Sequence, residues 1–255
     1  MNISEMLGEY ERDYALAMLG VEDFPYQKLS GKTIVVDGES EYMKFTVCMS
    51  LLALNDKEKL SIKVLMLGNG NELSEKLAER NDFSLCSYEQ AAATEYNFFI
   101  STGICGLELN GTSAEYCRIT NNFARAISTA KSCLERCILL SDYRVYGELE
   151  RGLVISENEA GFVPFSNNGD MSQTIAVSIE TYFSAYAKQF NLPTIILRSG
   201  ILLGAKAELP KNFTDELFSA VAEGKQISLP NTRKKYSFTY LNEVIHACLL
   251  YTSPS

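Results

Sequence analysis

Histidine is almost absent from this sequence, since His246 is the only one among 255 residues. Hydrolases of the Ser-His-Asp or Cys-His type use an imidazole as their general base. His246 lies in the apolar stretch EVIHACLL, which has the pattern of a helix and not of a catalytic loop. The shortage of histidine therefore argues against nucleophilic hydrolysis of this kind.

Basic residues are also scarce, with 23 Lys and Arg against 32 Asp and Glu and a net charge of −9. A nucleic-acid partner requires a basic face, so none is expected. No apolar run approaches the roughly 20 residues that cross a bilayer. The acidic start MNISEMLGEYERDY lacks the basic-then-apolar order of a signal peptide. We therefore expect a cytoplasmic protein with no nucleic-acid or membrane partner.

The seven cysteines do not form a metal-binding pattern. Cys133 and Cys137 have the spacing of neighbours on a helix, but no second pair lies near them. Structural zinc sites use four ligands, commonly in two close pairs. We expect no metal, and we expect free thiols that act as small buried apolar groups in a reducing compartment.

Short apolar runs alternate with helical patterns along most of the chain. The runs are KTIVV (32–36), IKVLML (62–67), NFFI (97–100), CILL (137–140) and TIIL (194–197). Helical patterns cover about 42–54, 113–133 and 172–190. This alternation is typical of βαβ units. It predicts an α/β fold with a Rossmann-like doubly wound parallel sheet.

Four parts of the chain differ in character. Residues 1–28 are expected to form a helical leader, and residues 29–204 the Rossmann-like domain of the NAD(P)-binding type. Residues 205–247 are expected to form a small, truncated C-terminal substrate lobe. The ending CLLYTSPS, residues 248–255, resembles the translated read-through of a common sequencing adapter, so we expect a metagenomic fragment whose native sequence is represented to about Ala247; a natural C-terminal tail is the alternative.

Four motifs occur in an order that carries a family resemblance. They are LSGKTIVVDGESEYM, ILLSDYRVYGE, IETYFSAYAKQFNLPTIILRSGILLG and YSFTYLNEVIHA. Together they resemble the NAD-dependent epimerase/dehydratase family, the extended short-chain dehydrogenases that modify nucleotide sugars. The resemblance implies a nucleotide-sugar ligand from surface-polysaccharide metabolism and NAD or NADP as cofactor.

The resemblance also implies a homodimer, or a heterodimer with an active homologue. Relatives pair through the two helices that correspond here to about 113–133 and 172–190. Both predicted helices carry apolar stripes, which include Ile175, Ile179 and Phe183. These stripes fit a four-helix interface.

The cofactor loop departs from the family pattern Gly-x-x-Gly-x-x-Gly. Gly38 matches the first glycine, whereas Glu41 and Lys44 stand at the second and third positions. Glu39 and Glu41 place carboxylates where a pyrophosphate would lie, and like charges repel. The resemblance still assigns three residues to cofactor binding, and these are Gly38, Asn69 and Ser141. Cofactor binding is therefore doubtful.

The family's catalytic Ser, Tyr and Lys are also replaced. Alignment of the motifs puts Asp142 at the serine, Ser172 at the tyrosine and Ala176 at the lysine. The lysine of the family lowers the pKa of the tyrosine from its ordinary value of about 10. Without either group we expect no hydride-transfer catalysis.

Several family positions keep their residue type. Tyr146, Arg198 and Arg233 match places that contact substrate, but packing of Tyr146 and Arg198 within the scaffold is an alternative role. A solvated turn is the alternative for Arg233, and Glu243 is expected to cap the helix that follows it.

The sequence thus favours a catalytically inactive member of the resembled family. The alternative is an active nucleotide-sugar epimerase, dehydratase or decarboxylase with a rearranged site. In that site Asp142 would act as the base and Tyr143 or Tyr146 as the acid, because strand ends of this fold present ligand-binding residues.

Overall fold

The structure, a computed structural model, describes residues 26–68, 70, 72–147, 156–157, 171–203, 219–226 and 237–252. The expected leader helix, Asn69 and Arg233 lie outside the described residues.

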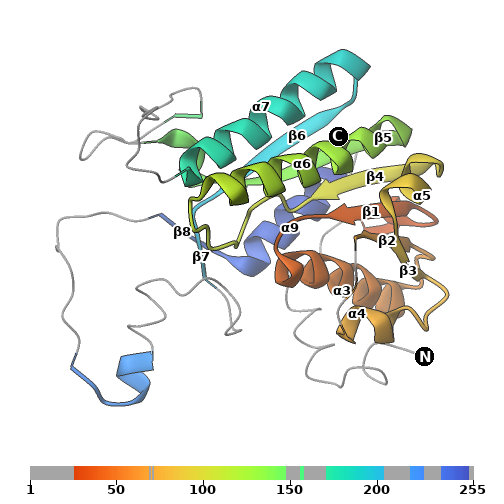
Figure 1. Cartoon of the computed structure of the whole chain (residues 1–255). Coiled ribbons are helices and arrows are strands. Elements are labelled where there is room, and N and C mark those ends of the chain that lie inside the picture. The colour runs from red at the N-terminus through yellow and green to blue at the C-terminus, as the bar shows by residue number, and fades with distance from the viewer. Residues whose placement is uncertain are drawn as a thin grey trace.

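A six-stranded parallel sheet forms the centre of the molecule (Figure 1). Its strands are β1 Thr33–Asp37, β2 Lys63–Leu67, β3 Phe83–Cys86, β4 Tyr96–Ser101, β5 Cys133–Asp142 and β6 Thr194–Ser199. They lie in the order β3-β2-β1-β4-β5-β6, and every neighbouring pair is parallel. The chain winds outward in opposite directions from β1 and β4, so the predicted doubly wound Rossmann-like sheet is confirmed.

Helices cover both faces of the sheet (Figure 1). The α-helices are α3 Glu41–Glu58, α4 Glu72–Leu77, α5 Tyr88–Ala92, α6 Ser113–Thr129, α7 Ser172–Phe190 and α9 Leu241–Thr252. Short 3-10 helices are η1 Tyr26–Leu29, η2 Ala130–Ser132 and η3 Tyr143–Tyr146. Among the described helices, none combines the length and the apolar character needed to cross a membrane.

The apolar strands supply two hydrophobic cores because alternate side chains point to opposite faces. On β1, Ile34 and Val36 pack in the cluster that includes α3 and α9. Val35, between them, packs in the cluster that includes α6 and α7. A strand with both faces covered needs an uninterrupted apolar run, which is why the run at 32–36 predicted this strand correctly.

Helix α3 starts close to the end of β1. Ser40 is its N-cap, and the Ser40 hydroxyl accepts a hydrogen bond from the Met43 backbone N–H at 3.3 Å. The helix is longer than predicted and continues to Glu58, where Lys59 adopts a left-handed conformation and ends it. The short connection leaves Gly38 and Glu39 at the carboxyl edge of the sheet, beside the end of β4.

One strand was missed by the sequence predictions, and two further boundaries differ from them. β3 was not predicted, because FSLC is only four residues long and Ser84 is exposed, so no continuous apolar run marks it. The helix predicted over 113–133 ends at Thr129, and β5 begins at Cys133 rather than Cys137. Residues 134–136 at the start of β5 are exposed or half-buried and include Glu135 and Arg136, which hid this part of the strand from a search for apolar runs.

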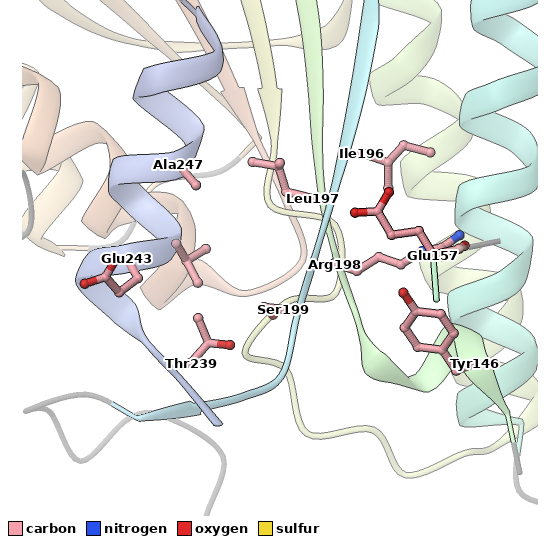
Figure 2. Close-up of a pocket in the computed structure, with 10 residues that line it drawn as sticks. Tyr146, Glu157, Ile196, Leu197, Arg198, Ser199, Thr239, Glu243 and Ala247 are labelled. Carbon is pink, nitrogen blue, oxygen red and sulfur yellow. The ribbon is translucent and has the colours of Figure 1, made fainter. Parts of the chain in front are cut away.

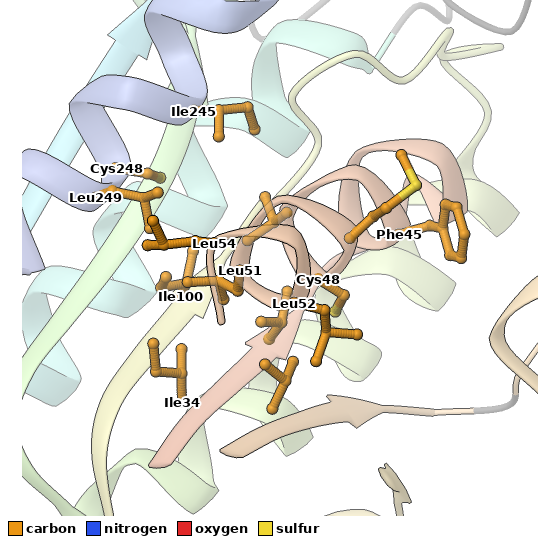
Figure 3. Close-up of a cluster of buried hydrophobic side chains, with 14 of the residues drawn as sticks. Ile34, Phe45, Cys48, Leu51, Leu52, Leu54, Ile100, Ile245, Cys248 and Leu249 are labelled. Carbon is orange, nitrogen blue, oxygen red and sulfur yellow. The ribbon is translucent and has the colours of Figure 1, made fainter. Parts of the chain in front are cut away.

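The C-terminal segment returns to the main core. β7 Ile201–Leu203 pairs with β8 Phe238–Tyr240, and α9 follows β8 directly. Helix α9 crosses the predicted lobe boundary at Ala247, and Cys248 and Leu249 are buried against residues of α3 and β4 (Figure 3). Helix α9 thus runs across residue 247 without interruption and contributes to the hydrophobic core of the sheet.

Candidate functional site

The crevice at the carboxyl ends of β1 and β4 is where a doubly wound sheet of this order binds ligands. Here two backbone hydrogen bonds cross it. The Thr102 N–H donates to the Asp37 carbonyl at 2.8 Å, and the Glu39 N–H donates to the Gly103 carbonyl at 3.0 Å. The loops after β1 and β4 are thus tied to each other at the floor of the crevice.

Gly38 allows these two loops to approach. Its φ angle is +153°, and a Cβ atom at this position would lie 1.8 Å from the Thr102 hydroxyl oxygen. Only glycine fits this conformation and this spacing. The Thr102 hydroxyl itself is buried and has no hydrogen-bond partner among the described residues. Gly38, the predicted cofactor contact, serves loop-to-loop packing in this structure.

Glu39 extends from the same loop to helix α6. Its carboxylate accepts hydrogen bonds from the Arg118 guanidinium and from the Asn122 amide, the latter at 3.0 Å. The Glu39 side chain is 13% exposed, whereas that of Arg118 is 53% exposed. The carboxylate that was predicted to repel a pyrophosphate is therefore held by a cation and an amide of α6.

Lys44 occupies the place of the third glycine with a buried ammonium group. Its Nζ donates to the Glu41 carboxylate at 2.8 Å and to the Leu67 carbonyl at 3.1 Å. Leu67 ends β2, the strand end near which the adenosine ribose lies in dinucleotide-binding sheets. The lysine side chain, only 4% exposed, thus fills space between α3 and β2.

Asp37, the last residue of β1, adds a buried acid to this region. Burial raises the pKa of its carboxyl to about 6, although Lys44 and the Ser101 hydroxyl act in the opposite direction. The Ser101 hydroxyl donates to Asp37 Oδ2 at 3.2 Å. The crevice floor therefore holds an acid that titrates near neutrality.

Asp142, which stands at the family's serine position, is engaged by Arg144. Both carboxylate oxygens accept from the Arg144 side chain, with Nε at 3.0 Å and 2.9 Å, and Oδ1 also accepts from the Arg144 backbone N–H at 2.9 Å. Burial lowers the pKa of Arg144, but its bonds to Asp142 outweigh burial and hold that pKa above the ordinary value. Asp142 is thus a capping and ion-pairing residue, which disfavours it as the base of a rearranged site.

Ser172 and Ala176 lie in the first turns of α7. Ala176 is 1% exposed and packs in the core, and Ser172 is half-buried. Ser141, a predicted cofactor contact, is buried in β5, where its carbonyl accepts from the Ser199 hydroxyl at 3.4 Å. A serine hydroxyl and an alanine methyl cannot supply the phenol and ammonium of the family's catalytic pair.

The apolar stripe of α7 faces the sheet and not a partner. Ile175, Ile179 and Phe183 are each at most 2% exposed and pack in the core with α6 and β5. Their use as support for a four-helix interface is therefore wrong. On the outward side, Tyr182 is 47% exposed and Phe190 is 43% exposed, so a second chain would have to contact these residues instead.

A cavity of about 410 Å³ lies along β6 (Figure 2). Its lining residues are Tyr146, Glu157, Ile196, Leu197, Arg198, Ser199, Thr239, Glu243, Val244 and Ala247. Tyr146 and Arg198 lie on the α7 side of β6, and Thr239 and Glu243 lie toward α9 (Figure 2). The structure thus brings together two of the predicted substrate residues.

Tyr146 and Arg198 also have the scaffold role that was their alternative. The Arg198 guanidinium lies 4.9 Å from the centre of the Tyr146 ring. Its Nε and Nη2 donate to the buried Glu180 carboxylate at 2.9 Å and 2.7 Å, and Nη1 donates to the Glu157 carbonyl at 2.9 Å. The hydrogen bonds to Glu180 raise the pKa of Arg198. Arg198 therefore links β6 to α7. Because several of its N–H groups already have protein partners, only the remaining ones can donate to a ligand in the cavity.

The sequence did not indicate two polar residues of the site, Glu157 and Thr239, which line the cavity. Glu243, expected to cap the following helix, lies instead within the first turn of α9 and lines the cavity. Within the described ranges, no group of three or more His, Cys, Asp or Glu residues is arranged to hold a metal ion.

The strand order and the helices on both faces define a Rossmann-like fold, to which the small β7–β8 pair is added. Neither a protein-family model nor a curated protein matches the sequence. Solved structures do match it, and several are nucleotide-sugar epimerases.

One is UDP-glucuronic acid 4-epimerase from Bacillus cereus in complex with UDP-glucuronic acid and NAD, with 17% identity and a TM-score of 0.58 over 84% of this chain and 70% of that one. Another is UDP-N-acetylglucosamine 4-epimerase from Methanobrevibacter ruminantium in complex with UDP-N-acetylmuramic acid, with 16% identity and a TM-score of 0.62 over 88% and 73%. A third is ADP-L-glycero-D-manno-heptose-6-epimerase from Helicobacter pylori, with 12% identity and a TM-score of 0.61 over 91% and 76%. The chain has the fold of these enzymes.

Proposed function

We propose that this protein binds a nucleotide sugar on an epimerase/dehydratase scaffold and does not catalyse hydride transfer. The observation that carries the proposal is the Asp142–Arg144 ion pair at the family's serine position. A carboxylate whose two oxygens already hold a guanidinium is a poor substitute for a hydroxyl that must bond a reacting substrate atom. Ser172 and Ala176 supply no general base beside it.

We also propose that the protein has little or no affinity for NAD and NADP. Lys44 fills the space near the end of β2, and the loops after β1 and β4 are joined by Thr102 and Glu39. An adenosine ribose near the end of β2 would have to displace the Lys44 side chain from the Leu67 carbonyl. That displacement costs free energy, which reduces the net affinity for the dinucleotide.

The cavity along β6 supports the sugar-binding part of the proposal. The Tyr146 ring offers an aromatic face for the apolar side of a sugar ring, and Thr239, Glu157 and Glu243 offer hydrogen-bonding groups for hydroxyls. Binding sites for small molecules combine such an apolar wall with a few placed polar groups. The volume of about 410 Å³ is within the range of such sites.

Calorimetric titration and thermal unfolding of the full chain test this function. We expect UDP-glucuronic acid or UDP-N-acetylmuramic acid to bind and, at a hundred times its Kd, to raise the free energy of unfolding by about 2.7 kcal/mol. We expect NAD and NADP to leave the unfolding temperature unchanged. Tyr146→Ala should weaken sugar-nucleotide binding, whereas Tyr182→Ala, on the outward face of α7, should not.

A turnover assay with the same nucleotide sugars, followed by NMR with and without NAD, completes the test. We expect no epimerised or dehydrated product. Product formation that depends on bound NAD would contradict the proposal, and so would the absence of binding for every nucleotide sugar tested.

A further inference from the structure

The cavity along β6 has acidic side chains on two sides. Glu243 comes from the first turn of α9, and Glu157 lies beside Tyr146 and Arg198 (Figure 2). Both glutamates are exposed, and within the part of the chain that the structure describes neither carboxylate forms an ion pair. A ligand in the cavity therefore meets two carboxylates that have no counter-ion among these residues.

Arg198 is the cation among the residues that line this cavity, and its charge is already balanced. Its guanidinium donates to both oxygens of the Glu180 carboxylate, whose side chain is 10% exposed, with the shorter distance at 2.7 Å. A bidentate pair of this kind uses the donors that would otherwise bind an acidic group of a ligand. The charge that a ligand meets in the cavity is thus predominantly negative.

A wall of this charge discriminates between sugars that differ in one substituent. The apolar side chains and the Tyr146 ring contact the carbon framework that all such sugars share. A protonated amino group is attracted to the two carboxylates, a hydroxyl is neutral, and a second carboxylate is repelled. Charges in a cleft act through its low-dielectric walls, so the selection does not require direct contact with each glutamate.

We propose that the cavity prefers a nucleotide sugar whose sugar ring carries a free, protonated amino group, and that Glu157 and Glu243 make this selection. The inference rests on the proposed function, because it concerns the sugar that enters the same cavity. The amino group, and not the diphosphate, lies beside the two carboxylates. Nucleotide sugars with a uronic acid bind to the same cavity more weakly.

Calorimetric titration of the full chain with UDP-glucosamine, UDP-glucose and UDP-glucuronic acid tests this selection. The three ligands share their nucleotide, and at about pH 6 the amine is protonated while the carboxylates are ionised. We expect the affinity to fall in the order given, with at least about tenfold between the first and the last ligand.

Variants of the two glutamates assign the selection to them. Glu157→Gln and Glu243→Gln should each reduce the difference in affinity, and the double variant should abolish it. Glu95→Gln is the matched control, because it removes the same charge from an exposed glutamate that precedes β4, at the amino edge of the sheet. This control should keep the full difference.

Equal affinities of the natural chain for the three ligands would overturn this inference and leave the proposed function standing. A preference that persists in the double variant would overturn it too. If that variant does not fold, the natural chain is titrated at about 0.05 M and about 0.5 M salt, where screening should remove most of the difference, and an undiminished difference counts against the inference. Failure of all three ligands to bind contradicts the proposed function itself.

Discussion

At the scale of single residues, Asp37 makes the stability of the fold depend on pH. Its ordinary pKa is 3.8, and burial raises the pKa to about 6 in the folded chain. Between these values the folded state holds a proton that the unfolded state has lost. Stability contributed by the protonated carboxyl is therefore present below about pH 4 and is lost as the pH rises to about 6.

We expect Asp37→Asn to abolish this pH-dependent loss of stability. An amide has no proton to lose, so the variant should be more stable than the natural chain at pH 7.5 by roughly 3 kcal/mol, from about 1.4 kcal/mol per pKa unit. The two proteins should converge near pH 4. Urea unfolding at a series of pH values measures the difference, with the exposed Glu79→Gln as control. A constant offset between Asp37→Asn and the natural chain at every pH would contradict this account.

At the scale of elements, α3 and α7 end in the same backbone conformation but with different residues. Lys59 ends α3 with φ 55°, and Asn191 ends α7 with φ 53°. Both lie in the left-handed region, which asparagine tolerates better than lysine and glycine tolerates best. The end of α3 therefore carries more backbone strain than the end of α7.

We expect Lys59→Gly to raise the free energy of unfolding by about 0.5 kcal/mol, because relief of the strain exceeds the added entropy of the unfolded chain. Asn191→Gly, the matched variant, should change it by less than about 0.3 kcal/mol. Chemical denaturation of both variants measures the two effects. Equal gains at the two positions would show that residue type at these caps does not matter.

At the scale of the whole molecule, α9 closes one face of the sheet. It contacts β5 and β6 after a chain path through β7 and β8, and it places Cys248 and Leu249 in the core that α3 shares. The last described helix of the chain therefore contributes to the same hydrophobic core as the first strand.

Adjacent leucines of α9 test this contribution. Leu249 is 1% exposed and Leu250 is 46% exposed. Leu249→Ala should lower the free energy of unfolding by about 3 kcal/mol through reduced burial and a cavity, whereas Leu250→Ala should cost less than about 0.5 kcal/mol. Urea unfolding measures both. A small effect at Leu249 would indicate that α9 does not stabilise the sheet.

The sequence by itself determined the fold class, because a strand buried on both faces must be a continuous apolar run, as at Ile34–Val36 and Cys137–Leu140. The order of the motifs also yields the prediction that Asp142, Ser172 and Ala176 stand at the catalytic positions of the resembled family. The exposed or half-buried residues in the middle of β3 and at the start of β5 left no such run, so β3 and the first residues of β5 were missed.

Only the tertiary structure decided which groups meet. Glu39 and Arg118 are far apart in the chain, as are Lys44 and Leu67, and no local pattern predicts contacts that depend on how α6 and β2 pack. The same reason explains the stripe of α7, whose apolar side faces the sheet because α7 packs on β5. Periodicity shows that a helix has an apolar side, but the neighbouring elements determine what that side covers.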